Sequence, residues 1–401
     1  MVQEVALSRS STAYCGDFAI PLKDLLLAAH RIRTRIVERF LQDVTLSGGI
    51  RCAITMWEYV EHGQFTTWPN STLSAILLDL QGFSVHDPRD HVYGVLGLYR
   101  SHKLQPQPVL VPHYAKSLAE VLQDATRWTF EGNLARGFAP NYHEITHRPG
   151  DLRSGEFPSW VMRWDRAWEV GKDALPISAS SFAGGPGPLN RLPTLGPQDR
   201  FGVVGRIFDR IKTAGPVWQW ATFRSARALL IRLEKPRLLC EAQGKTDDSA
   251  LAMTLVAGFD LQPPSPPRRA KRALECFLGF VREGKLSPDG FDRQQSNQSM
   301  RPGSSDVELA SDYLEAMTDA CAYRRCFITN SGYFGIGPQV WEPGDIIVVF
   351  RGYHLPVMLR PLQTKDPYQF CGVTYVYGIM DGKWMETEIA RRARNDVFWL
   401  V

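Results

Sequence analysis

The fold is decided by four runs of sequence: Arg325-Cys-Phe-Ile-Thr-Asn-Ser-Gly-Tyr-Phe-Gly-Ile-Gly-Pro338, Gly344-Asp-Ile-Ile-Val-Val-Phe350, Leu355-Pro-Val-Met-Leu-Arg360 and Phe370-Cys-Gly-Val-Thr-Tyr-Val-Tyr377. The runs are rich in Val, Ile, Phe and Tyr and are separated by Gly, Pro, Asn and Asp, which is typical of antiparallel strands joined by tight turns. Residues 346–350 are apolar throughout, which predicts a central strand buried on both faces. Four or five such strands can hold a core by closing on themselves, so we expect a small half-open antiparallel β-barrel over residues 325–384.

The composition limits the class of protein. A chain of 401 residues is expected to form two or three domains, and its 44% hydrophobic and 22% charged residues are ordinary globular values. A net charge of +4 argues against a dedicated nucleic-acid binder, which would concentrate basic residues on one face. The seven cysteines are scattered and form no C-x-x-C pair, which favours a reducing, cytoplasmic compartment. No apolar run approaches about 20 residues, so no membrane span is predicted.

The remaining patterns predict helices before and between the strands. Pro21 precedes an amphipathic run, residues 71–80 form another, and Ser117-Leu-Ala-Glu120 and Ser305-Asp-Val-Glu308 are capping boxes that each begin a helix. Residues 201–211 resume strand patterning and could add a strand to the barrel. We therefore expect an α+β protein, with a helical half followed by a half that contains the barrel. The expected division is a helical domain over 8–175, a Gly- and Pro-rich linker over 176–199, and an α+β domain over 200–401 with a mobile insert at 262–304.

The segment Asp87-Pro-Arg-Asp-His-Val-Tyr-Gly-Val-Leu-Gly-Leu98 has two interpretations. In the first, Asp87 caps a helix that begins at Pro88, Asp90 reaches back in the manner of a capping box, Arg89 pairs locally, and Gly97 ends the helix. In the second, the acids and Arg89 form a charged functional site. The first interpretation is favoured because each acid lies where the positive end of a helix attracts it.

His143-Glu-Ile-Thr-His147 matches the H-E-x-x-H pattern of zinc hydrolases. That chemistry needs both imidazoles on one supported helix, with Glu144 as the base and a third ligand from elsewhere. Pro140 and Pro149 leave room for only about eight helical residues, and such short helices are marginal. A polar surface loop is therefore preferred to a zinc site. Gly332-Tyr-Phe-Gly-Ile-Gly337 lies between predicted strands, so its glycines indicate turns and bulges and not a nucleotide-binding loop.

Taken in order, several segments resemble the fungal heterokaryon-incompatibility (HET) protein family. Met1-Val-Gln-Glu-Val-Ala-Leu7 is similar to the Trp-x-x-Gln-Glu segment that closes the family's HET domain, and residues 87–98 are similar to its strongest downstream motif. Tyr14-Cys-Gly-Asp17, residues 114–128, Pro158-Ser-Trp160 and Tyr375-Val-Tyr-Gly-Ile-Met-Asp-Gly382 resemble further landmarks, as does Gly344-Asp345 with residues 356–360. The positions carried over, with an expected role that is mainly structural, are Gln3, Glu4, Gly16, Asp87, Pro88, Arg89, Asp90, Tyr93, Leu96, Gly97, Leu98, Pro158, Trp160, Gly344, Asp345, Pro356, Leu359, Arg360, Gly378 and Gly382.

The chain departs from this family at its start. The Tyr-x-Trp-Gly and Asp-Ala-Ile-Cys-Ile-Asn-Gln segments of the HET domain are absent, so residues 1–7 are interpreted as a remnant of that domain and the chain as a truncated C-terminal portion. The resemblance implies self/non-self recognition after hyphal fusion, ending in programmed cell death, and some domains suspected to be distantly related to HET cleave NAD. We expect a non-enzymatic regulatory or recognition portion with a protein partner, no cofactor, and no catalytic or metal-binding residue. The alternative is an enzyme, with either residual NAD cleavage of the Toll/interleukin-1-receptor type or zinc hydrolysis through His143 and His147.

Overall fold

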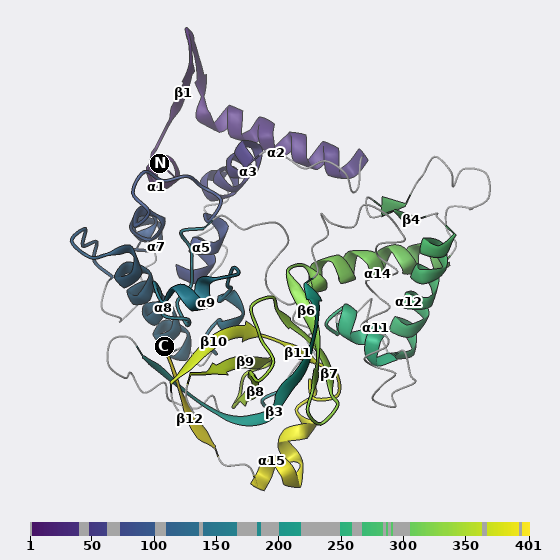
Figure 1. The fold of residues 1–401 in the computed structure, drawn as a ribbon. Coiled ribbons are helices and arrows are strands. Elements are labelled where there is room, and N and C mark those ends of the chain that lie inside the picture. The colour runs from purple at the N-terminus through teal and green to yellow at the C-terminus, as the bar shows by residue number, and fades with distance from the viewer. Residues whose placement is uncertain are drawn as a thin grey trace. The chain divides into compact units, whose positions relative to one another are not determined.

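The computed structural model describes residues 2–39, 48–61, 73–100, 110–135, 139–166, 183–185, 200–217, 249–258, 267–283, 286–287, 290–291, 305–362, 367–392 and 395–401 (Figure 1). The chain divides into two compact units, which are described separately. The N-terminal unit contains Met1–Pro140 and Met162–Glu169, and the C-terminal unit contains Asn141–Val161 and Val170–Val401. The chain therefore crosses between the units more than once, and residues 141–161 group with the sheet-containing unit.

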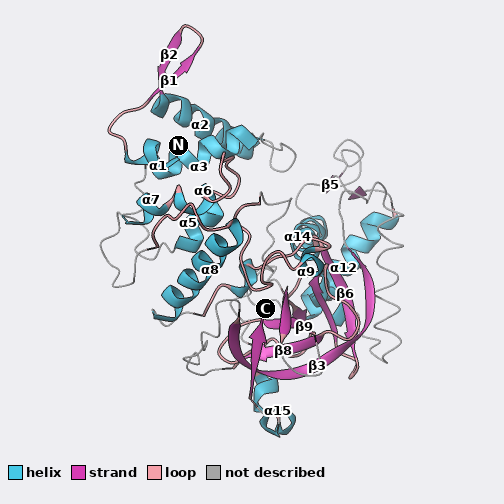
Figure 2. Ribbon diagram, turned by 60° about the vertical axis from the view of Figure 1, so that its left-hand side comes forward, coloured by secondary structure: helices cyan, strands magenta, loops and turns pink. Residues whose placement is uncertain are grey.

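The N-terminal unit is helical apart from one hairpin. Its elements are α1 (Val2–Leu7), β1 (Thr12–Cys15), β2 (Phe18–Pro21), α2 (Leu22–Arg39), α3 (Gly48–Glu61), α5 (Leu73–Asp79), α6 (Asp90–Tyr93), α7 (Leu96–Arg100) and α8 (Leu118–Ala135). The β1–β2 hairpin turns through Gly16 and Asp17 and projects from the start of α2 (Figures 1 and 2). The first residues, whose pattern left strand and helix open, are helical.

Helix α8 shows how local sequence builds this unit. The Ser117 N–H donates to Glu120 Oε2 at 2.7 Å, and the Glu120 N–H donates in return to Ser117 Oγ at 3.3 Å, so the capping box is formed. Buried residues of α8 recur at three- and four-residue spacing, as in Leu122, Ala125, Thr129 and Asn133, with Val121, Thr126 and Phe130 buried beside them. Thr126 on the same helix accepts the Met162 N–H at 3.1 Å, which fastens the second segment of the unit to α8.

The C-terminal unit is organised around an eight-stranded sheet. Its strands are β3 (Phe201–Val217), β6 (Arg324–Thr329), β7 (Phe334–Pro338), β8 (Ile346–Phe350), β9 (Pro356–Pro361), β10 (Tyr368–Val373), β11 (Tyr375–Val376) and β12 (Asp396–Leu400), in the spatial order β11-β7-β6-β3-β12-β10-β9-β8. Strand β8 also pairs with β3, so the pairings lead around from β3 through β12, β10, β9 and β8 back to β3. The β10–β12 connection consists of one parallel pair, Tyr368 with Leu400, which leaves the structure barrel-like and incompletely closed.

The expected fold class is confirmed: helices dominate the N-terminal unit, and a small barrel-like sheet dominates the C-terminal one. Residues 201–211 do supply a strand, and β3 is long enough to pair with β12, β8 and β6 along its length. Residues 346–350 form a strand that is paired on both sides and buried at every position. Residues 396–400, which lie after the expected barrel run of 325–384, form β12 and pair with β3 from Asp396 to Leu400.

The other elements of this unit are short or helical. They are η1 (Tyr142–Glu144), α9 (Asp151–Ser154), α11 (Ser249–Leu255), α12 (Pro267–Arg282), β4 (Leu286–Ser287), β5 (Gly290–Phe291), α14 (Ser305–Cys321), η3 (Lys383–Glu386) and α15 (Glu388–Arg392). Helices α11, α12 and α14 pack together beside β6 and β7 (Figure 1).

Helix α12 corrects the mobile insert that the sequence suggested at 262–304. Residues 267–282 are helical because Pro267 occupies the helix start, where a proline is tolerated, and Ala270, Leu274, Phe277 and Val281 follow at three- and four-residue spacing and are buried. The basic residues beside them obscured this pattern in the sequence. Residues 218–234, for which a helix is expected, lie outside the described part of the chain.

Candidate functional site

Two residues from separate motifs meet in the N-terminal unit. Gln3 of α1 accepts the Gly97 N–H through Oε1 at 3.1 Å, across 94 positions of sequence. Gly97 lies inside α7 and does not end a helix as predicted, and a Cβ at this position would come within 2.4 Å of the Gln3 amide. Glycine at 97 therefore makes the space into which the Gln3 side chain fits.

The Asp87 and Arg89 side chains bind each other, and Arg89 also binds the loop before α8. Asp87 Oδ1 accepts the Arg89 N–H at 3.0 Å and Arg89 Nε at 2.9 Å, and Asp87 Oδ2 accepts Arg89 Nη2 at 2.6 Å. Arg89 Nη1 also donates to the carbonyls of Tyr114 and Lys116. The hydrogen bonds from Arg89 lower the pKa of Asp87 to about 2. This guanidinium thus joins the Asp87 turn to the segment that precedes α8.

Asp90 has a different partner from the one its position predicts. Instead of reaching back to a free amide at the helix start, Asp90 Oδ1 accepts the Tyr114 hydroxyl. Tyr114 packs edge-on against Tyr93, with ring centroids 5.3 Å apart, and hydrogen bonding to Asp90 raises the pKa of Tyr114 to about 12. Of the other positions in this motif, Val92, Leu96 and Leu98 are buried. Arg89 and Asp90 therefore bind the segment before α8, and Asp87 orients Arg89.

In the C-terminal unit, residues 158–160 hold the chain end. Trp160 is fully buried and stacks on Phe201, with centroids 5.5 Å apart. The Ser159 N–H donates to the Val401 carbonyl at 2.8 Å, and Ser159 Oγ accepts the Phe370 N–H at 2.7 Å. Trp164, four residues later in the sequence, is also buried but belongs to the N-terminal unit.

The Gly344-Asp345 and Arg360 positions meet in a buried ion pair. Asp345 is 3% exposed, and its carboxylate accepts Arg360 Nε and Nη2, each at 3.0 Å, and the Glu342 N–H at 2.8 Å. Gly344 adopts φ of +98°, a conformation that side-chain-bearing residues rarely adopt, and this turn places Asp345 at the start of β8. The Cys371 thiol lies 3.7 Å from Asp345, and burial raises the pKa of that thiol well above its usual value.

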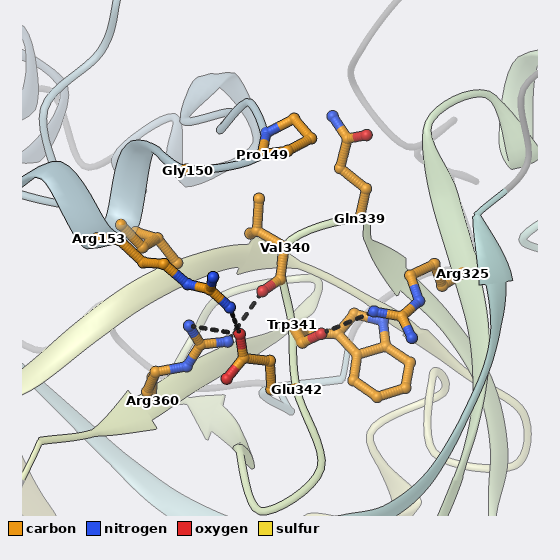
Figure 3. Close-up of a pocket in the computed structure, with 10 residues that line it drawn as sticks. Pro149, Gly150, Arg153, Arg325, Gln339, Val340, Trp341, Glu342 and Arg360 are labelled. Carbon is orange, nitrogen blue, oxygen red and sulfur yellow. Dashed lines mark hydrogen bonds and ion pairs between the residues drawn. The ribbon is translucent and has the colours of Figure 1, made fainter.

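This ion pair forms one side of a half-open cavity of about 240 Å³ (Figure 3). Three arginines line the cavity, namely Arg153 from α9, Arg325 from β6 and Arg360 from β9. Glu342 is the acidic residue among the lining side chains, and its Oε1 lies 2.9 Å from Arg153 Nη2 and 3.7 Å from Arg360 Nη1. Pro149, Gly150, Leu152, Gln339, Val340 and Trp341 complete the wall.

The electrostatics of this cavity favour negative charge. The hydrogen bond from Arg153 holds the pKa of Glu342 below its usual value against the effect of burial, and Arg360, Arg153 and Arg325 lower it further through their charges. Burial lowers the pKa of Arg325, and the charge of Glu342 only partly offsets this effect. Arg325 also lies over the Trp341 ring, 4.7 Å from its centroid, and donates to the Trp341 carbonyl at 3.1 Å. The cavity can therefore hold an anion.

The H-E-x-x-H segment does not form the helix that zinc chemistry requires. Only Tyr142–Glu144 is helical, as a single 3-10 turn, and Ile145 is extended. His143 Nδ1 lies 3.3 Å from the Tyr353 hydroxyl, and Glu144 accepts the Asn141 amide at 2.6 Å. Burial, with a smaller contribution from His354, lowers the pKa of His143 to about 4. Within the described residues, no group of three or more His, Cys, Asp or Glu side chains could hold a metal ion.

Sequence reasoning missed the charged wall of the cavity. Arg153, Arg325 and Glu342 had no assigned role, and only Arg360 was among the motif positions. Arg153 and Glu342 are 189 positions apart, so no local spacing connects them. Of the remaining motif positions, Gly16, Gly378 and Gly382 lie at turns, Pro356 and Leu359 lie in β9, and Glu4 is exposed in α1.

The C-terminal part of the chain matches a known domain. Residues 283–401 match the model of the Het-6 β-barrel domain. This range contains β6 through β12, whereas β3, which joins the two ends of the barrel-like ring, lies before it.

The whole chain is similar to a characterised fungal protein. It is 40% identical, over 457 aligned positions, to heterokaryon incompatibility protein 6, OR allele, of Neurospora crassa. The alignment covers 100% of this chain and 65% of the relative, so the chain spans just under two thirds of that protein's length. No solved structure matches the chain. The resemblance stated from the sequence motifs is confirmed by both findings.

Proposed function

We propose that the chain belongs to the fungal heterokaryon-incompatibility protein family and is a non-enzymatic regulatory or recognition portion of an incompatibility protein, as its Het-6 β-barrel match and its similarity to heterokaryon incompatibility protein 6 suggest. In this role it contributes to self/non-self recognition between fused hyphae and to the programmed cell death that follows. It acts in the cytoplasm through a protein partner and does not bind nucleic acid. Among the described residues, no helix has the length and apolar character needed to cross a bilayer.

The observation that carries this proposal is how the motif side chains are used. Gln3 binds Gly97, Arg89 binds Asp87 and two loop carbonyls, and Asp345 binds Arg360. Each polar group is directed at another part of its own unit. Residues that serve a reaction generally keep a polar atom facing a cavity where substrate can reach it. A framework that presents a surface to a partner accounts for these contacts more simply.

The enzymatic alternative through His143 and His147 has less support. Its first histidine contacts a tyrosine hydroxyl, its glutamate binds a neighbouring amide, and the helix that would align the two imidazoles stops at Glu144. A zinc hydrolase needs these groups to converge on one ion. His143 therefore supports the packing around Tyr353, and the recognition role is the better account.

A hyphal-fusion assay tests the proposal. Two otherwise compatible fungal strains are paired, one of them expressing the full chain, and dead fusion cells are scored with a vital dye. We expect expression to change the frequency of death, and we expect the Glu144→Gln variant to act as the wild type does. No change on expression would count against a role in incompatibility. Loss of the effect in a folded Glu144→Gln variant would instead favour the enzymatic alternative.

A further inference from the structure

The cavity described above contains a charged group that an incoming ligand can replace. Glu342 and Arg153 form an ion pair at 2.9 Å, but the Arg153 side chain is 80% exposed and that of Glu342 is 46% exposed. Exposed ion pairs contribute little to stability because water and salt screen them. The Glu342 backbone is held by Asp345, whereas its carboxylate extends into the half-open cavity (Figure 3). The Glu342 carboxylate can therefore rotate away from Arg153 at a small cost in free energy.

The donors around that carboxylate are better fixed than the carboxylate itself. Arg360 uses Nε and Nη2 to bind Asp345, which orients its remaining Nη1 toward Glu342 at 3.7 Å. Arg325 is held over the Trp341 ring by its contact with the indole and by its hydrogen bond to the Trp341 carbonyl. Two guanidiniums are thus preorganised and a third, on Arg153, is adjustable. Guanidinium groups recognise carboxylate and phosphate oxygens through short charge-assisted hydrogen bonds.

From this geometry we propose that the cavity is a binding site for a ligand that carries a carboxylate or phosphate group beside an apolar or aromatic portion. The anionic group takes the place of the Glu342 carboxylate beside Arg153 and Arg360. The apolar portion lies against Val340 and Leu152. Glu342 is then an internal competitor that keeps the arginines in position when the site is empty of ligand.

The lining supports this occupant in charge and in shape. Among the described residues that line the cavity there are three guanidiniums and one carboxylate, and buried Asp345 pairs with Arg360 behind the wall. The depressed pKa of Glu342 shows that the cavity stabilises an anion at that point, first through the hydrogen bond from Arg153. A volume of about 240 Å³ accommodates one charged group and a single ring, and not a nucleotide. This inference does not depend on the function proposed above.

Calorimetric titration of the full chain with three matched probes tests the site. Phenyl phosphate and benzoate carry the two candidate anions on the same ring, and benzyl alcohol is the neutral control. We expect both anions to bind saturably, with an affinity that falls as salt is raised, and benzyl alcohol to bind at least tenfold more weakly than the better anion, a difference of about 1.4 kcal/mol. The stronger of the two anions identifies which group the site prefers.

Single substitutions separate this site from general anion attraction. Glu342→Gln removes the competitor and should tighten binding about two- to fivefold, whereas Arg153→Gln should weaken it by a similar factor, as expected for one partly exposed ion pair. Arg351→Gln, at an exposed arginine outside the cavity wall, is the matched control and should leave binding unchanged. Absence of saturable binding to the Glu342→Gln variant would overturn the proposal. Equal weakening by Arg153→Gln and Arg351→Gln would do so as well.

Discussion

Replacing Arg360 with methionine should unfold the C-terminal unit more readily, because it strands a buried carboxylate. Asp345 is 3% exposed and receives two hydrogen bonds from Arg360, each at 3.0 Å. After Arg360→Met, the Glu342 N–H at 2.8 Å remains as its backbone donor. Removing one member of a buried ion pair costs about 3–5 kcal/mol, since the other charge is left without compensation. The same carboxylate is close to the Cys371 thiol, a weak donor that cannot replace a guanidinium.

The size of this effect can be measured by denaturant or thermal unfolding. A domain of this size loses about 2–4 °C for each kcal/mol, so the midpoint should fall by roughly 10 °C. The free energy of unfolding of Arg351→Met, a substitution at an exposed position of the same unit, should lie within about 0.5 kcal/mol of the wild-type value.

This reasoning would be refuted if the loss of unfolding free energy for Arg360→Met were within about 1 kcal/mol of that for the Arg351→Met control. Replacing both partners, as Asp345→Leu with Arg360→Met, should recover part of the loss, because an apolar pair of similar volume leaves no buried charge.

Three further predictions concern the motif residues. In the wild type, Gly97→Ala should leave the free energy of unfolding unchanged or lower it, because the new methyl group meets the Gln3 amide. When Gln3 is also replaced by alanine, the same substitution should stabilise the protein by up to about 1 kcal/mol. Equal effects of Gly97→Ala in both backgrounds, measured by urea unfolding, would contradict the contact. Arg89→Gln should raise the pKa of Asp87 from about 2 toward its ordinary value of about 3.9, which a carboxyl-carbon NMR titration would detect or disprove. The folded-state pKa of His143 is lowered to about 4 by burial and a neighbouring imidazole, so its contribution to stability is complete above about pH 6.5 and is lost as the pH falls to 4, by up to about 3 kcal/mol. His143→Gln should flatten the unfolding free energy over this pH window, and an unchanged slope would exclude His143 as its cause.

Local sequence was sufficient where an element is stabilised by its own neighbours. Strands β6 to β10 follow from runs of branched and aromatic residues between turn residues, and α8 follows from its capping box. The family motifs likewise led to Asp345 and Arg360, although the sequence did not show that these two residues bind each other.

The missed features depend on contacts between distant parts of the chain. Strand β12 is a five-residue run that is stabilised by pairing with β3, which lies almost 200 positions earlier. Helix α12 was concealed because its proline and basic residues suggested a spacer, although its apolar residues were correctly spaced. The cavity joins α9, β6 and β9 through arginines that carry no signal on their own strands or helix.

The central claim is that the family motifs in this chain build structure and do not perform chemistry. The most direct measurement is release of nicotinamide when the purified full chain is incubated with NAD, followed by chromatography. The account predicts no release above that of a buffer control. Saturable release that disappears when the protein is unfolded would contradict it.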